Sequence, residues 1–358
     1  MIAPNPTRIP ARGATSNPAN RFEPIHLERD ADWNPEEDAL PTTKFFHDRT
    51  QTILNRNDSP DIGFTYSINP YRGCEHGCIY CYARPFHEYL GFSAGLDFET
   101  RIMVKTHAPQ LLREELSSPR WQPQCIAMSG VTDCYQPVER KLKLTRGCLE
   151  VLAEFRNPVG IVTKNALVTR DLDLLTELAR HNAVVVFVSV TTLDPDLRKV
   201  MEPRTAPPAA RLATIRKLRD AGVPVGVMVA PVIPGLTDHE IPNIIAAAAE
   251  AGAQSAGTVT LRLPFAVAPL FEQWLATHFP DRKEKVLNCL RALRGGKLYD
   301  AQFGQRMTGE GIFAEQIEQL FNVACRRAGI GASHVQLSTK SFRHPGGRQL
   351  GLFDEPVK

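Results

Sequence analysis

The sequence contains no apolar run long enough to span a membrane. A membrane helix needs about 18 or more consecutive apolar residues, and the best candidate here is a short alanine-rich stretch at residues 244–251. The first residues also lack the apolar core of a secretory signal peptide. We therefore expect a cytoplasmic protein with no membrane partner.

The chain also lacks a strong excess of charge. Its 42 Lys and Arg residues and 39 Asp and Glu residues give a net charge of +3. This balance permits a nucleic-acid partner without indicating one. The basic segments 282–294 and 340–348 are not interleaved with aromatic residues, so the sequence shows no array for stacking bases.

The eight cysteines show no disulfide framework, which suits a reducing compartment. Cys74, Cys78 and Cys81 form a C-x3-C-x2-C run with no fourth cysteine nearby. The other five form no local motif, and such cysteines are most often small buried apolar residues. They are Cys125, Cys134, Cys148, Cys289 and Cys325.

Three thiolates on one short loop can each bind a different iron of a cubane and leave the fourth iron open to a small molecule. A structural zinc site is the first alternative, with His76 or His87 as the fourth ligand. Zinc sites usually combine two close ligand pairs, and no second pair follows here. A closed electron-transfer cluster is the second alternative, although it would need a fourth local thiolate. Either alternative would suit a non-catalytic interaction protein.

Short β-branched runs alternate with helical patterns from about residue 60 onward, which predicts a parallel sheet with helical crossovers. We predict three regions: an irregular N-terminal extension (1–58), an α/β region (59–265) and a helical C-terminal region with a basic tail (266–358). We expect the extension to wrap around the domain through apolar anchors at residues 45–46 and 53–54. The predicted strands are 64–68, 126–129, 159–163, 184–190, 225–230 and 258–263, and the predicted helices are 142–155, 172–181, 209–221, 240–251, 270–278, 282–294 and 310–328.

The cysteine run, including the aromatic Tyr80 just before the last cysteine, resembles the cluster loop of the radical S-adenosylmethionine superfamily. The resemblance implies a partial (β/α)6 TIM-type barrel, in which ligands bind at the carboxyl ends of the strands. It also implies a [4Fe-4S] cluster whose open iron binds S-adenosylmethionine, and an electron donor such as flavodoxin or ferredoxin. Reductive cleavage of S-adenosylmethionine would then release a 5′-deoxyadenosyl radical that abstracts hydrogen from a substrate.

Residues 132–137, Thr-Asp-Cys-Tyr-Gln-Pro, are similar to a Thr-Asp-Pro-Tyr-Gln-Pro run in relatives of spore photolyase. Here Cys134 replaces the first proline, and the Gly-Gly-Glu form of the wider superfamily is absent. The likeness implies a nucleic-acid substrate, as in a DNA repair photolyase. A fold does not transfer a substrate, so a peptide or a small metabolite stays open as the alternative.

The resemblance also suggests which polar residues at the predicted strand ends bind the cofactor. The segment that holds its amino group corresponds to Ser129, Gly130, Thr132 and Asp133, although Asp133 can instead cap a helix. Lys164 would neutralise the carboxylate, or would be a solvated lysine. Ser189 and Thr191 would reach the ribose, and the strand at 225–230 would pack against the adenine. Arg204 would approach the cofactor, or would pair with Glu202.

A radical enzyme that returns hydrogen to its product needs a donor with a weak bond, and a thiol meets that need. We expect Cys134 at the mouth of the site, where it can act as this donor. The alternative is a small residue that stands in a loop by chance. Cys125 lies at the start of a predicted strand, and we expect it to be structural.

Overall fold

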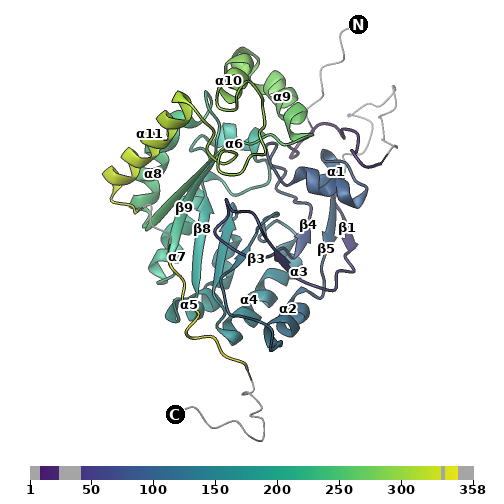
Figure 1. Ribbon diagram of the computed structural model, residues 1–358, viewed down its shortest axis with the longest axis vertical. Coiled ribbons are helices and arrows are strands. Elements are labelled where there is room, and N and C mark those ends of the chain that lie inside the picture. Colours follow the sequence, from purple (N-terminus) through teal and green to yellow (C-terminus); the bar gives the residue numbers. More distant parts are fainter. Residues whose placement is uncertain (1–8, 24–41, 332–334, 346–358) are drawn as a thin grey trace, which may run out of the picture.

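The computed structural model describes residues 9–23, 42–331 and 335–345. Its main sheet has seven strands in the order β10-β9-β8-β7-β6-β3-β2, and all neighbours are parallel except β2 and β3 (Figure 1). The six parallel strands confirm the predicted partial (β/α)6 barrel. The strands are β2 (Leu54–Arg56), β3 (Tyr66–Ile68), β6 (Ile126–Met128), β7 (Val159–Thr163), β8 (Val184–Ser189), β9 (Val225–Val232) and β10 (Ser255–Thr260).

Helical segments connect the parallel strands, because each apolar strand must bury one face against a helix. In Figure 1, α5 and α7 lie along one face of the sheet and α11 packs beside α8, whereas α1 lies beside β5 (Arg101–Val104). The helices between β3 and β10 are η1 (Arg84–Leu90), α1 (Leu96–Thr100), α2 (Ala108–Ser117), α3 (Glu139–Leu142), α4 (Leu144–Phe155), η2 (Ala166–Asp171), α5 (Leu172–Arg180), α6 (Pro195–Met201), α7 (Pro208–Asp220), η3 (Asp238–Glu240) and α8 (Ile241–Glu250). After β10 come α9 (Val267–His278), α10 (Pro280–Ala292) and α11 (Ile312–Ala328), which confirm the helical prediction for this part.

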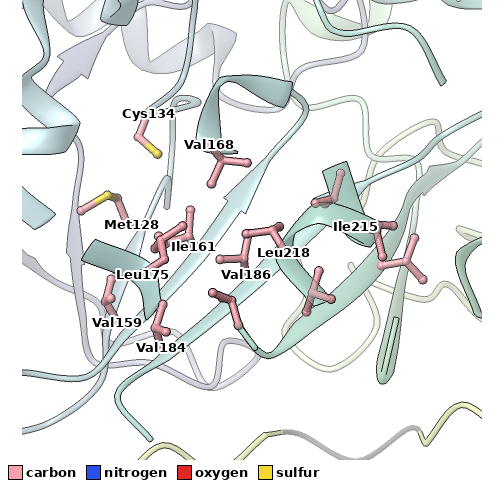
Figure 2. Close-up of a cluster of buried hydrophobic side chains, with 14 of the residues drawn as sticks. Met128, Cys134, Val159, Ile161, Val168, Leu175, Val184, Val186, Ile215 and Leu218 are labelled. Carbon is pink, nitrogen blue, oxygen red and sulfur yellow. The ribbon is translucent and has the colours of Figure 1, made fainter. Parts of the chain in front are cut away.

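The two faces of the sheet differ because side chains alternate along each strand. Met128 lies beside Ile161, and Ile161 lies beside Val186, so these side chains share one face. All three are fully buried in the core that packs against the helices, as Figure 2 shows. The burial of this face under helices explains the apolar residue at every second position of these strands.

The opposite face of the sheet is more open. Ala127, Gly160, Phe187 and Met228 lie on it and are only half-buried, and Val162 is exposed. This inner face of the barrel is therefore where a ligand can contact several strands at once.

The last strand differs from the prediction, since β10 covers Ser255–Thr260 instead of residues 258–263. Leu261 and Leu263 continue the apolar run, but their side chains pack in a second core with α9 and α10. The apolar run in the sequence therefore continues beyond the last residue of the strand.

The N-terminal stretch predicted to be irregular contains two short strands. β1 (Lys44–His47) pairs with β5 (Arg101–Val104), which also pairs with β4 (Tyr71–Arg72), and β2 adds an antiparallel edge to the main sheet. Ile53 is fully buried, as expected of an anchor, whereas Phe45 is largely exposed. The acidic stretch at 28–38 and the basic tail beyond residue 345 lie outside the described residues.

Residues 9–23, which we call the N-terminal arm, pack against the cysteine loop and the segment that follows it. Ile9 and Ala14 are buried in the same core as Ile79 and Tyr80. The arm therefore wraps the domain, as predicted. Among the described residues, no helix combines the length and apolar character required to cross a bilayer.

Candidate functional site

The loop with Cys74, Cys78 and Cys81 lies at the carboxyl ends of the parallel strands. Segments that follow three of those strands contact it: Gln136 after β6, Asn165 after β7 and Arg204 after β8. Because the carboxyl ends of parallel strands meet at one edge of a sheet, residues far apart in the sequence converge on the loop. The loop is thus held from several sides.

All three loop thiols are free, Cys74 and Cys78 are buried, and Cys81 is half-buried. Burial raises the pKa of each of these thiols, since it disfavours the thiolate. Among the described residues, no three His, Cys, Asp or Glu side chains gather around a single metal position. The ligands of a cubane bind separate irons and need not converge on one point. Three free thiols on one loop therefore fit a [4Fe-4S] cluster.

A buried ion pair fixes the shape of the loop. Arg84 is fully buried and donates to the carbonyl oxygens of Cys78 at 3.0 Å and Gly95 at 2.9 Å. It also pairs with Glu99, which is equally buried, at 2.6 Å. Because the guanidinium binds the loop and the following segment together, it sets the path of the chain between Cys78 and Glu99.

The same carboxylate holds the N-terminal arm. The backbone N–H groups of Gly13 and Ala14 donate to Glu99 at 3.1 and 2.8 Å. A Cβ atom at Gly13 would lie 1.9 Å from the carbonyl oxygen of Gly77, inside the cysteine loop. Only glycine permits this approach, so the arm and the loop pack backbone to backbone.

A second set of contacts fixes the first half of the loop. Gln136 accepts from the N–H of Glu75 at 2.9 Å and donates to the carbonyl of Gly73 at 3.2 Å. The Glu75 carboxylate accepts from the N–H of Val138 and pairs with Arg204 at 3.0 Å. The predicted alternative for Arg204, an ion pair with Glu202, is wrong: the turn after α6 directs the guanidinium to Glu75 in the loop.

Asp133 joins the loop to the end of β7. Its carboxylate accepts from the hydroxyl of Thr163 at 2.9 Å, the N–H of Lys164 at 2.8 Å and the N–H of Tyr135 at 2.9 Å. His76 lies 3.4 Å away. Burial alone would raise the pKa of Asp133, but the neighbouring imidazole and these hydrogen bonds lower it. The carboxylate is thus charged and occupied by partners from two segments.

Tyr80 enters a buried network under the loop. Its hydroxyl donates to the carboxylate of Glu202, which also accepts from Thr191 at 2.7 Å and pairs with the fully buried Arg211. Burial alone would raise the pKa of Glu202, but Arg211 and then Lys164 lower it to about 2. Glu202 is therefore a permanent anion beneath the cysteine loop.

Lys164 lies on the inner side of the sheet, above this anion. Its ammonium group is 5.8 Å from the centre of the Tyr80 ring and donates to the carbonyl of Ala230 at 3.4 Å. The side chain is half-buried rather than fully solvated. The cation is therefore available to an anionic ligand at the carboxyl ends of the strands.

The segment after β6 turns sharply. Ser129 adopts a positive φ of 77°, and its hydroxyl accepts from the N–H of Cys134 at 2.9 Å. The hydroxyl of Thr132 donates to the carbonyl of Tyr71 at 2.9 Å. The Gly130 carbonyl accepts from the Tyr82 hydroxyl at 2.6 Å, and a Cβ atom at Gly130 would lie 2.9 Å from Ser67. These contacts hold the turn against the cysteine loop.

The expected position of Cys134 at the mouth of the site is wrong. Its thiol is fully buried in the core between the sheet and the helices, near Met128 and Val168 (Figure 2). The turn after β6 directs this side chain away from the inner face of the barrel. Cys125, expected to be structural, is half-buried and lines a cavity of about 320 Å³ with Phe64 and Gln124.

Several residues that build the site carried no signal in the sequence. Arg84 and Glu99 are ordinary charged residues whose pairing depends on the turn of η1 and α1. Only a three-dimensional arrangement brings these charges into contact, so local patterns could not identify them.

Comparisons with known proteins agree with this geometry. The family model described as the Radical SAM superfamily matches residues 68–248, which include the cysteine loop and most of the parallel strands. An uncharacterised protein of Mycobacterium tuberculosis is 42% identical over 222 residues, which cover 62% of this chain and 65% of that protein. The chain thus spans about 65% of the length of this curated relative.

Solved structures of spore photoproduct lyase share the fold. A mutant of that lyase superposes with a TM-score of 0.59 at 17% identity, and the match covers 82% of each chain. Another mutant, solved with bound AdoMet and dinucleoside spore photoproduct, gives a TM-score of 0.56 at 18% identity, covering 79% of this chain and 78% of that one. At this identity the likeness concerns the fold.

Proposed function

Because this chain belongs to the radical SAM superfamily, we propose that Cys74, Cys78 and Cys81 hold a [4Fe-4S] cluster that binds S-adenosylmethionine. The observation that carries the proposal is the donor set: three free thiols on one loop, fixed from the ends of three strands. When bound, the reduced cluster and S-adenosylmethionine supply a 5′-deoxyadenosyl radical that removes hydrogen from a substrate. The chain's own residues orient the reactants and exclude water.

Lys164 is the residue we assign to the carboxylate of S-adenosylmethionine. Its ammonium group is the cation near the Tyr80 ring, on the inner side of the sheet. Glu202 stays charged, and its carboxylate is paired with the buried Arg211. The positive charge of Lys164 is therefore available to attract the carboxylate of a bound ligand.

We propose the remaining cofactor-binding residues from their positions at the carboxyl ends of the strands. We assign the amino group to the turn of Ser129 and Gly130, where carbonyl oxygens can accept from an ammonium. The ribose is assigned to Ser189 and Thr191; since the Thr191 hydroxyl donates to Glu202, it would accept from the ribose. Thr132, Asp133 and Arg204 are assigned supporting roles, because each is held by neighbouring segments.

For the substrate we propose a nucleic acid that carries a lesion. The support is the likeness of the fold to spore photoproduct lyase, one structure of which holds AdoMet and dinucleoside spore photoproduct. The electron donor is proposed to be a small redox protein such as flavodoxin or ferredoxin.

The test is anaerobic reconstitution with iron and sulfide, followed by reduction in the presence of S-adenosylmethionine. We expect a broad absorbance near 400 nm, typical of iron–sulfur proteins at about that wavelength, and release of 5′-deoxyadenosine. Cys78→Ala should abolish both, whereas Cys289→Ala, which removes a half-buried cysteine outside the loop, should retain both. If the wild-type protein binds iron but releases no 5′-deoxyadenosine, the proposed enzyme function is wrong.

A further inference from the structure

Four aromatic rings and one arginine from distant segments lie next to one another at the surface, with three of the rings exposed and Tyr299 half-buried. Phe22 stacks on Tyr89 with 4.7 Å between ring centres, and Phe265 lies 6.2 Å from Tyr299. Arg21 connects the two pairs, since its guanidinium is 5.0 Å from the Phe22 ring and 3.9 Å from the Phe265 ring. We call these five residues the aromatic strip.

Three rings of the strip are largely exposed, although large aromatic side chains are usually buried. The exposed fractions are 52% for Phe22, 68% for Tyr89 and 57% for Phe265. Single exposed aromatic residues are common, but a contiguous apolar surface usually marks a binding site. Phe86, three residues before Tyr89 on the 3₁₀-helix η1, extends the surface with an exposed fraction of 52%.

Backbone strain at Phe265 supports a binding role. This residue adopts a positive φ of 50°, a conformation that bulky side chains rarely occupy. The chain thus holds a large apolar ring in an unfavourable conformation and leaves it in solvent. Strain of this kind persists mostly at functional sites.

The strip stands beside the proposed active site. Tyr89 belongs to η1, which begins three residues after Cys81, and Phe265 follows the carboxyl end of β10. Between these elements, the guanidinium of Arg262 lies 4.8 Å from the centre of the Tyr82 ring, and Tyr82 is adjacent to Cys81. A polymer lying on the strip would therefore pass the open edge of the barrel next to the cysteine loop.

We propose that the aromatic strip binds unpaired bases of a single-stranded nucleic acid next to the reacting nucleotide. This inference rests on the proposed function, because it takes the substrate to be a nucleic acid. Rings on both sides of a guanidinium group suit a chain of flat bases joined by phosphates. Arg21 also pairs with the buried Glu88 at 2.6 Å, which fixes its guanidinium between the rings.

The sequence showed no such array, since its aromatic residues do not alternate with the basic segments at 282–294 and 340–348. The fold assembles the strip from the N-terminal arm, from η1 and from the segments on either side of α9 and α10. Its rings come from positions more than two hundred residues apart.

The test measures binding of a fluorescein-labelled thymidine oligonucleotide of about 12 nucleotides by fluorescence anisotropy. The reconstituted holoenzyme and its Tyr89→Ala and Phe265→Ala variants are compared. Each substitution should raise Kd by about 5- to 150-fold, the range expected for the loss of a stacked base. Phe265→Trp should retain binding. Phe313→Ala, which removes a ring of 48% exposure on α11, is the matched control and should bind as the wild type does.

An abasic strand of the same length separates stacking from charge. We expect it to bind the wild type about as weakly as the thymidine strand binds Phe265→Ala. Equal binding of the abasic and thymidine strands, tighter binding of a duplex, or unchanged Kd in both alanine variants would each overturn the inference.

Reductive cleavage of S-adenosylmethionine without substrate is measured on the same samples. It should be unchanged in the strip variants, because these rings are not among the residues that hold the cysteine loop. A wild-type protein that releases no 5′-deoxyadenosine contradicts the proposed function, whereas one that releases it but shows no base-dependent binding contradicts only the strip.

Discussion

The buried carboxylate of Glu99 offers the sharpest test of how the cysteine loop is held. It accepts one hydrogen bond from Arg84 and two from the backbone of the N-terminal arm. Glu99→Gln keeps the shape of the side chain but removes its charge. The Arg84 guanidinium, fully buried, then loses its only carboxylate partner among the described residues.

The expected loss of stability follows from this burial. Breaking a buried ion pair by neutralising one partner costs about 3–5 kcal/mol. The new amide NH₂ group would also face the N–H of Gly13 or Ala14, and the hydrogen bond lost there costs about 1 kcal/mol more. We expect the free energy of unfolding to fall by about 4–6 kcal/mol, out of a typical total of about 5–15 kcal/mol. Less iron should also bind on reconstitution, because Arg84 sets the path of the loop.

Glu154→Gln is the matched control. Glu154 pairs with Arg113 on the surface, where both side chains are over a third exposed. Pairs of this kind contribute about 0–1 kcal/mol. Both variants are unfolded in urea and followed by far-ultraviolet circular dichroism, and iron is measured after anaerobic reconstitution. If Glu99→Gln loses no more stability than Glu154→Gln and binds as much iron as the wild type, the carboxylate does not hold the loop.

Three further predictions concern other parts of the molecule. Gly13→Val would place a Cβ atom 1.9 Å from the Gly77 carbonyl oxygen, so it should displace the arm and speed native-state proteolysis of residues 9–23. Gly63→Val is the control, because a Cβ atom there would have no atom within 4 Å. Equal proteolysis rates for the two variants would contradict the packing of the arm on the loop. Burial lowers the pKa of His87 from 6.5 to about 4, so the unfolded chain binds more protons between these values and stability should fall by up to about 3 kcal/mol as the pH drops through them. His87→Leu should flatten this dependence, and an unchanged slope in urea unfolding would refute the assignment. Cys134→Ala should cost about 1 kcal/mol of core packing and leave the product profile unchanged, whereas an altered profile would support the hydrogen-donor role.

Local sequence was enough to identify the superfamily and the general fold. The spacing of Cys74, Cys78 and Cys81 acts within one loop, so it predicts three thiols that can bind separate irons of one cluster without knowledge of the rest of the chain. The alternation of β-branched and helical stretches reflects the burial of each element, and it predicted all six parallel strands, the last of them three residues too late in the chain. The end of the last strand was predicted wrongly, because Leu261 and Leu263 are apolar but pack in a core outside the sheet.

Tertiary structure decided which groups meet. Arg204 pairs with Glu75 instead of Glu202, and the thiol of Cys134 points into the core instead of the site. Glu99 receives hydrogen bonds from residues 85 and 86 positions earlier. Side-chain direction and long-range pairing depend on where turns place distant segments, and a pattern of neighbouring residues carries no record of that. The sequence thus determined the cysteine motif, and the fold determined its surroundings.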